Sequence, residues 1–183
     1  MIQKVSAAGK GFRGVLNYTL NTEKAPEIVA GNMAGEDSRS LSREFGDARA
    51  GNEAVTKPVF HASLSADLSD TVSPEKWREI AEAYIQRMGY GESLWVAVRH
   101  RDTDHDHIHI IASRVSHDGS RVPDHQERKR GETILRDLER EYGLKQIAPS
   151  REAERAAISR DELANFERTG HVSVKARLQE NID

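Results

Sequence analysis

Two patterns of apolar residues predict the secondary structure of this chain. Alternation of apolar with polar residues is typical of a half-buried strand, whereas recurrence every three or four residues is typical of an amphipathic helix. Alternation and short apolar runs predict strands over residues 1–6, 27–30, 58–65, 93–100 and 107–115. Helical spacing predicts helices over residues 12–21, 38–50, 74–88 and 128–142.

The fold class follows from the way these elements are connected. The strands over residues 93–100 and 107–115 are joined by residues 101–106 alone, and so short a connection predicts an antiparallel hairpin. Helices that interleave with antiparallel strands indicate an α+β fold, with a central, mainly antiparallel β-sheet flanked by helices. We expect the helices mainly on one face of the sheet, which leaves the other face free to carry a site.

Composition indicates a soluble globular protein with one main domain. The chain has 183 residues, of which 37% are hydrophobic and 31% charged, enough to bury a core beneath a charged surface. We place the domain at residues 1–147 and a charged extension, helical in part, at residues 148–183. No apolar run is long enough for a membrane span and the first residues lack a signal-peptide apolar region, so we expect a cytoplasmic, bacterial location without membrane insertion.

Cysteine content and net charge narrow the chemistry further. The chain contains no cysteine, so any metal ion must be bound by His, Asp or Glu. The formal net charge is −3. This charge argues against a protein that coats nucleic acid without regard to sequence, because such proteins are usually basic.

Three histidines are predicted to converge on the hairpin. His107 and His109 lie two positions apart on one strand and therefore share a face, while Ile108 and Ile110 point to the core. If the hairpin closes around its short loop, His100 lies opposite His107, with Cβ atoms about 4.5–5.5 Å apart. Three neutral imidazoles can bind one divalent cation and leave coordination positions open for substrate oxygens. The spacing therefore predicts a metal site.

Other metal motifs do not fit the sequence. Residues 102–113 begin like a calcium-binding loop, but His107 stands where Gly is required and Ser113 where the closing Glu is required. The chain also lacks a His-Glu-x-x-His sequence. Asp102 has two interpretations: it accepts a proton or hydrogen bond at the site, or it is a turn aspartate that bonds its own backbone.

Among the tyrosines, Tyr18 is the best candidate for a reactive hydroxyl. On a helix that begins at Phe12, Tyr18 falls about 130° from the centre of the apolar stripe. Tyr84 and Tyr142 lie on the apolar stripes of their helices, where a tyrosine usually packs. Tyr90 follows a glycine and fits either role.

The chain resembles the relaxase/mobilisation nucleases of the HUH endonuclease superfamily over about residues 1–147. Residues 98–111 are similar to the family's histidine motif, and residues 12–18 resemble the motif that carries the nucleophilic tyrosine. Residues 61–65 resemble a motif in which a strand ends in serine, and residues 113–119 and 135–144 are also similar to the family.

The resemblance implies a metal-dependent enzyme that nicks one DNA strand at an origin of transfer through a 5′-phosphotyrosyl intermediate, which initiates conjugative plasmid mobilisation. It implies Tyr18 as the nucleophile and His100, His107 and His109 as metal ligands. Asp102 is a further catalytic candidate because it lies two residues from His100. The expected metal is Mg or Mn, although three imidazoles also suit Zn, Ni or Co. Expected partners are single-stranded or hairpin DNA at the origin, accessory relaxosome proteins and a coupling protein.

Several interpretations stay open at this point. The general base is Asp102, His61 or another group. Two further functions remain: a rolling-circle replication initiator of the same superfamily, and a non-catalytic DNA- or metal-binding module that keeps the fold. Basic and hydroxyl side chains near the motifs are candidate DNA contacts, with ordinary solvated surface as the alternative; they are Lys4, Lys10, Arg13, Ser63, Ser65, Arg121, Arg128, Lys129 and Arg130.

Overall fold

A computed structural model describes residues 1–103 and 105–148, and Met1–Ile147 form one compact unit. Every predicted strand and helix is present, with ends that differ by one or two residues at most. In chain order the elements are β1 (Ile2–Val5), α1 (Phe12–Thr19), the 3-10 turn η1 (Thr22–Lys24), β2 (Glu27–Gly31), α2 (Ser38–Ala50), β3 (Val59–Ser65), α3 (Pro74–Met88), β4 (Ser93–His100), β5 (His107–Ser116) and α4 (Glu127–Glu141). The predicted extension lies outside the described residues, except for Ala148.

The strands form one antiparallel sheet in the order β1-β3-β5-β4-β2. β4 and β5 pair as the predicted hairpin, and His100 lies opposite His107 in the register. β3 flanks β5 on its other side, so the hairpin occupies the centre of the sheet and β1 and β2 form its edges. The predicted α+β class with a central antiparallel sheet is therefore confirmed.

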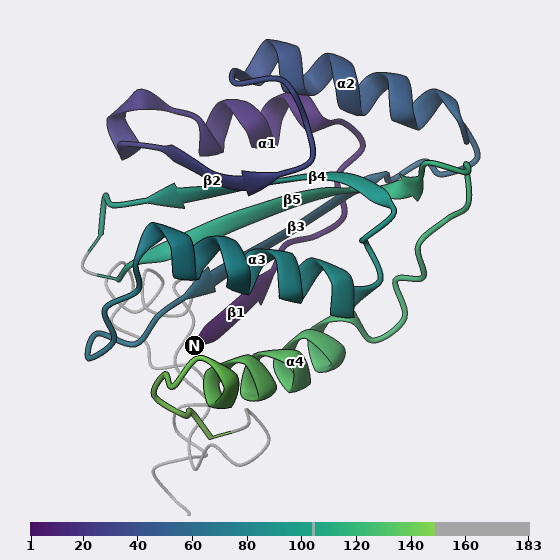
Figure 1. Cartoon of the computed structure of the whole chain (residues 1–183). Helices are drawn as coiled ribbons and strands as arrows, with labels where there is room; N and C mark the ends of the chain where they lie inside the picture. The colour runs from purple at the N-terminus through teal and green to yellow at the C-terminus, as the bar shows by residue number, and fades with distance from the viewer. Residues whose placement is uncertain (104, 149–183) are drawn as a thin grey trace, which may run out of the picture. The chain divides into compact units, whose positions relative to one another are not determined.

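Helices cover both faces of this sheet (Figure 1). On one face, α3 and α4 pack over the larger core, which includes Phe60, Trp77, Ile80, Ile108 and Leu138. On the other face, α1 and α2 pack over a smaller core made of Phe12, Leu16, Leu41, Phe45, Val59, Val96, Val98 and Ile111. The expectation of helices mainly on one face was wrong, because the central strands are apolar on both sides here and need a second layer to exclude water.

Local signals determine where the helices begin and end. The Ser73 hydroxyl accepts a hydrogen bond from the Lys76 amide at 3.2 Å, and Pro74 follows as the first helical residue of α3. Gly89 ends that helix at φ 87, in the left-handed region that favours glycine. Asp37 and Ser40 form a capping box at the start of α2. Within the described ranges, no helix has the length and apolar character that a membrane crossing needs.

Candidate active site

The three predicted histidines converge on the α1–α2 side of the sheet. His100 and His107 are register partners on β4 and β5, and His109 follows two residues later on the same face. One ligand nitrogen from each of the three lies within 4.8 Å of the others. The ring centroids of His100 and His109 are 4.5 Å apart, and that of His107 lies 5.3 Å from His100 and 5.2 Å from His109. This arrangement can bring three imidazoles to one ion.

The hydrogen bonds of these histidines leave one nitrogen of each ring for a metal. His100 Nε2 donates to the Thr19 carbonyl at 2.7 Å, and His107 Nδ1 donates to the His105 carbonyl at 2.9 Å. His109 Nδ1 shares a hydrogen bond with His61 Nε2 at 3.0 Å. Such outer contacts fix the tautomer and orientation of a metal-binding imidazole.

Two of the remaining nitrogens are buried without a hydrogen-bond partner, namely His100 Nδ1 and His109 Nε2. An unsatisfied buried nitrogen costs free energy, and a divalent cation would satisfy both. The histidine cluster therefore fits a divalent metal ion.

Burial keeps the imidazoles in the neutral form that a metal requires. Desolvation, with a smaller contribution from neighbouring histidines, lowers the pKa of His109 to about 3. Desolvation likewise lowers the pKa of His61 to about 4, and it lowers the pKa of His100. Because only a deprotonated nitrogen can bind a metal ion, His100 and His109 are ready for binding at neutral pH.

The opposite side of the sheet holds the hairpin loop in place. The Asp106 carboxylate accepts hydrogen bonds from the Arg99 guanidinium at 2.8 and 2.6 Å and from Trp77 Nε1 at 2.9 Å. Arg99 also donates to the Val72 carbonyl at 3.0 Å. Asp106 directly precedes His107, so these bonds fix the strand end that carries the ligand. Charged, bidentate contacts of this kind are among the stronger hydrogen bonds in proteins.

Tyr18 lies beside the cluster and off the apolar face of α1; its helical position predicted only the second of these features. Phe12, Leu16 and Thr19 of α1 are buried, whereas Tyr18 is 50% exposed. Its ring centroid is 5.7 Å from that of His109, with the planes at 84°. The carbonyl that His100 binds belongs to Thr19, the next residue. One hydrogen bond therefore links the backbone of the tyrosine helix to a candidate metal ligand.

Asp102 makes side-chain contacts at the candidate site. Its Oδ1 lies 3.9 Å from His107 Nε2, and its Oδ2 lies 3.5 Å from Lys24 Nζ. Lys24 Nζ in turn lies 3.9 Å from the centroid of the Tyr18 ring. Asp102 is thus joined to Tyr18 through a lysine that the sequence analysis missed.

Three of the predicted DNA contacts lie in cross-strand rows with the histidines. Ser63 pairs with His109 on one side and with Lys4 on the other. Ser65 pairs in the same way with His107 and with Ile2, which is 60% exposed. Register partners share a face of the sheet, so a polar path runs from the histidine cluster across β3 to the exposed edge strand β1.

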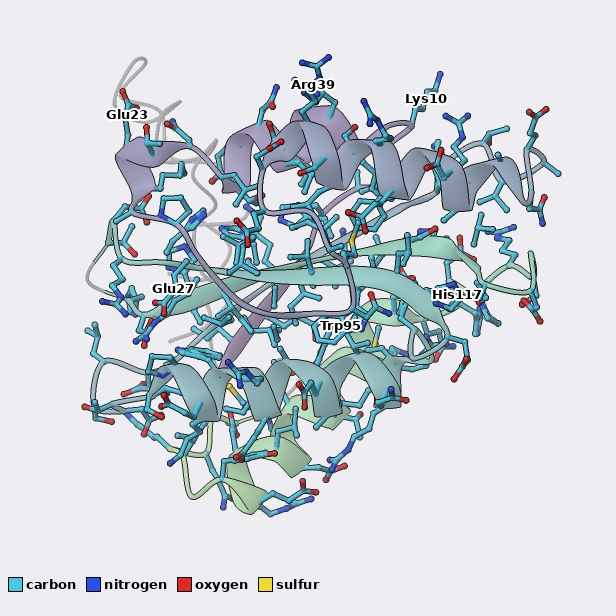
Figure 2. All side chains as sticks on the ribbon, turned by 45° about the horizontal axis from the view of Figure 1, so that its top comes forward. Lys10, Glu23, Glu27, Arg39, Trp95 and His117 are labelled. Atoms are coloured by element: carbon cyan, nitrogen blue, oxygen red, sulfur yellow. The ribbon has the colours of Figure 1, made fainter. Side chains whose placement is uncertain are left out.

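The other predicted DNA contacts lie elsewhere. Lys10 and Arg13 are exposed at the start of α1, and Figure 2 shows Lys10 and Glu23 beyond opposite ends of that helix. Arg128 and Lys129 line a cavity of about 530 Å³. Two more are already engaged: Arg121 pairs with Asp124 at 2.6 Å, and Arg130 donates to the Met88 carbonyl at 3.1 Å.

This fold and this site define a class of nuclease. The chain belongs to the relaxase family described as MobA/VirD2-like, nuclease domain, whose model matches residues 18–144. The resemblance inferred from the sequence motifs is thereby confirmed.

Individual relatives agree with this family. Protein TraI of Escherichia coli is 26% identical over an alignment of 140 positions, which covers 73% of this chain and 19% of TraI. The chain thus spans about a fifth of the length of that relative. Two Mn-bound crystal structures of the MobM relaxase domain with plasmid pMV158 oriT DNA share the fold, with TM-scores of 0.61 and 0.60 at 13% identity. The first match covers 91% of this chain and 97% of the MobM chain, and the second covers 93% and 98%.

Proposed function

We propose that this chain nicks and rejoins one strand of DNA at an origin of transfer and so initiates plasmid mobilisation. The observation that carries the proposal is the position of Tyr18, an exposed tyrosine with its ring 5.7 Å from a three-histidine cluster. Membership of the relaxase family and the fold shared with MobM, which was crystallised with oriT DNA, support it.

His100, His107 and His109 would hold the divalent ion, and Mn or Mg is the expected species. When bound, such an ion withdraws charge from the scissile phosphate and stabilises the negative charge that develops during attack. The protein's own contribution is to orient these rings, through Thr19, His105 and His61, and to keep the neighbouring nitrogens buried.

In the proposed reaction the Tyr18 oxygen forms a bond to phosphorus while the bond from phosphorus to the 3′-oxygen breaks. The leaving 3′-oxygen takes up a proton from solvent, so the products are a 5′-phosphotyrosyl protein and a free 3′-hydroxyl. Attack by a 3′-hydroxyl reverses the step and reseals a strand without ATP. Asp102 is the candidate acceptor for the phenol proton, since it is linked to the Tyr18 ring through Lys24.

The DNA strand would follow the polar path from the histidines to the edge of the sheet. Ser65, Ser63 and Lys4 offer hydroxyl and ammonium donors to phosphate oxygens along that path. With a net charge of −3, the protein suits a short, defined single strand better than general DNA coating. Accessory relaxosome proteins and a coupling protein are the partners that this role requires.

The proposal is tested with single-stranded oligonucleotides that tile the DNA flanking the gene, incubated with the protein and Mn²⁺. We expect one of them to be cut and to leave a covalent protein–DNA adduct on a denaturing gel. Tyr18→Phe should abolish the adduct, and Tyr142→Phe, at a partly buried tyrosine on the opposite side of the sheet, should retain it. An adduct that persists in Tyr18→Phe would contradict the assignment.

A further inference from the structure

Lys24 is placed by an unusual turn between α1 and β2. It is the last residue of η1, which begins after Asn21, whose side chain accepts a hydrogen bond from the Glu23 amide at 3.2 Å. The next residue, Ala25, adopts φ 43, a left-handed conformation that is uncommon for residues other than glycine. This turn directs the chain back along α1, and Lys24 thereby comes to lie against Tyr18.

The ammonium group of Lys24 contacts two groups of the candidate site. It lies 3.9 Å from the centroid of the Tyr18 ring and 3.5 Å from Asp102 Oδ2. The Lys24 side chain is only 20% exposed, although it sits on a surface turn. Interaction with the Tyr18 side chain is the largest cause of a raised pKa at Lys24, and Asp102 adds to it, so the lysine is charged at neutral pH.

The ring of Tyr18 is exposed near the end of its helix, so a contact with Lys24 can restrain it. Tyr18 is the penultimate residue of the short helix α1 and is half exposed. The ring centroids of His109 and His100 lie 5.7 and 6.4 Å from that of Tyr18. A cation over the face of a tyrosine ring is attracted to its π electrons and opposes rotation away from that position.

We propose that Lys24 is a positioning residue for the nucleophile: its ammonium, anchored by Asp102, holds the Tyr18 ring against the histidine cluster and faces the phosphate that Tyr18 would carry. The effect of Lys24 on the cleavage rate rests on the function proposed above, whereas its effect on the orientation of the Tyr18 ring does not. The contacts favour positioning over DNA binding, since the ammonium is already shared between an aromatic face and a carboxylate.

The first test measures cleavage in a single turnover at saturating origin DNA and Mn²⁺. Lys24→Met keeps the length of the side chain without its charge, and we expect the rate to fall about tenfold. Lys24→Arg retains a cation that stacks on aromatic rings and should recover most of the rate. Lys57→Met removes a charge from an exposed loop residue outside the site and should match the wild type. DNA affinity and Mn²⁺ affinity should stay within about twofold in every variant.

The second test needs neither DNA nor metal. We expect the aromatic NMR signals of Tyr18, assigned through Tyr18→Phe, to shift in Lys24→Met and to remain in place in Lys57→Met. If the wild-type protein forms no adduct, the proposed function fails while this measurement still decides the role of Lys24. Unchanged Tyr18 signals in Lys24→Met would overturn the positioning role. So would a loss of DNA affinity with an unchanged rate at saturation, which would instead make Lys24 a phosphate contact.

Discussion

The two faces of the β4–β5 hairpin have opposite chemistry, although their residues alternate along the same strands. On the α3–α4 side, Ile108 and Ile110 are fully buried in the larger core. On the α1–α2 side, His107 and His109 occupy the alternate positions and present ring nitrogens to a common point. Side chains on one strand point to opposite faces, so the core and the site are one residue apart.

The apolar face holds the histidine face rigid. The apolar face and the Arg99–Asp106–Trp77 hydrogen bonds anchor one side of the hairpin. The histidine face carries two buried nitrogens without a hydrogen-bond partner among the described residues. Folding stability therefore depends mainly on the residues of the apolar face, and metal binding on the residues that alternate with them. Substitutions at adjacent positions should separate these two properties.

The largest effect on metal binding is expected at His109, and its neighbour Ile110 on the other face serves for comparison. His109→Ala removes a metal ligand, and we expect Mn²⁺ affinity, measured by calorimetry, to fall more than about 100-fold. The metal-free protein should lose less stability than Ile110→Ala does, because removal of the unsatisfied His109 Nε2 offsets part of the cost of the lost His61 hydrogen bond.

Ile110→Ala is the matched substitution on the other face. It leaves a cavity in the core and should lower the free energy of unfolding by about 2–5 kcal/mol, while the folded fraction binds Mn²⁺ nearly as the wild type does. If both variants lost Mn²⁺ affinity equally, metal binding would depend on both faces of the hairpin, contrary to this account.

A smaller effect is expected at His61, which supports the site without facing the metal. His61→Phe keeps the ring and removes the hydrogen bond to His109 Nδ1. Loss of such an outer partner should weaken Mn²⁺ binding by about 10- to 100-fold. Phe60→Leu, one residue away on the opposite face, is the control and should retain the affinity. Unchanged binding in His61→Phe would show that the His61–His109 contact does not orient the ligand.

The smallest effect concerns the path from the site to the edge of the sheet. Lys4→Met should weaken binding of single-stranded DNA a few-fold and make the plot of log affinity against log salt concentration shallower by about 0.7. Fluorescence anisotropy at several salt concentrations measures both. Lys57→Met is again the control, and an identical salt dependence in Lys4→Met would remove Lys4 from the DNA path.

The sequence predicted those parts of the site that depend on local geometry. The period of two placed His107 and His109 on one face, the short loop placed His100 opposite His107, and the helical period moved Tyr18 off the core. Each of these relations holds within one strand, one hairpin or one helix, so no distant part of the chain was needed.

The remaining parts depend on contacts between distant segments. His61 reaches His109 only because of the register between β3 and β5. Lys24 reaches Tyr18 through a turn at Ala25 that has no glycine to signal a positive φ. The side of the sheet on which α1 and α2 pack was also mispredicted, because apolar periodicity reports that a helix has a buried face but not which face of the sheet it covers.

If Tyr18 attacks the DNA, mass spectrometry will locate the covalently bound nucleotide on its side chain. Trypsin cuts after Arg13 and Lys24 and releases a peptide, residues 14–24, whose only tyrosine is Tyr18. After reaction with origin DNA and Mn²⁺ and digestion of the attached strand, we expect the phosphonucleotide mass on this peptide, with fragment ions that assign it to Tyr18. A phosphonucleotide on a peptide that contains Tyr84, Tyr90 or Tyr142, or no modified peptide despite cleavage, would contradict attack by Tyr18.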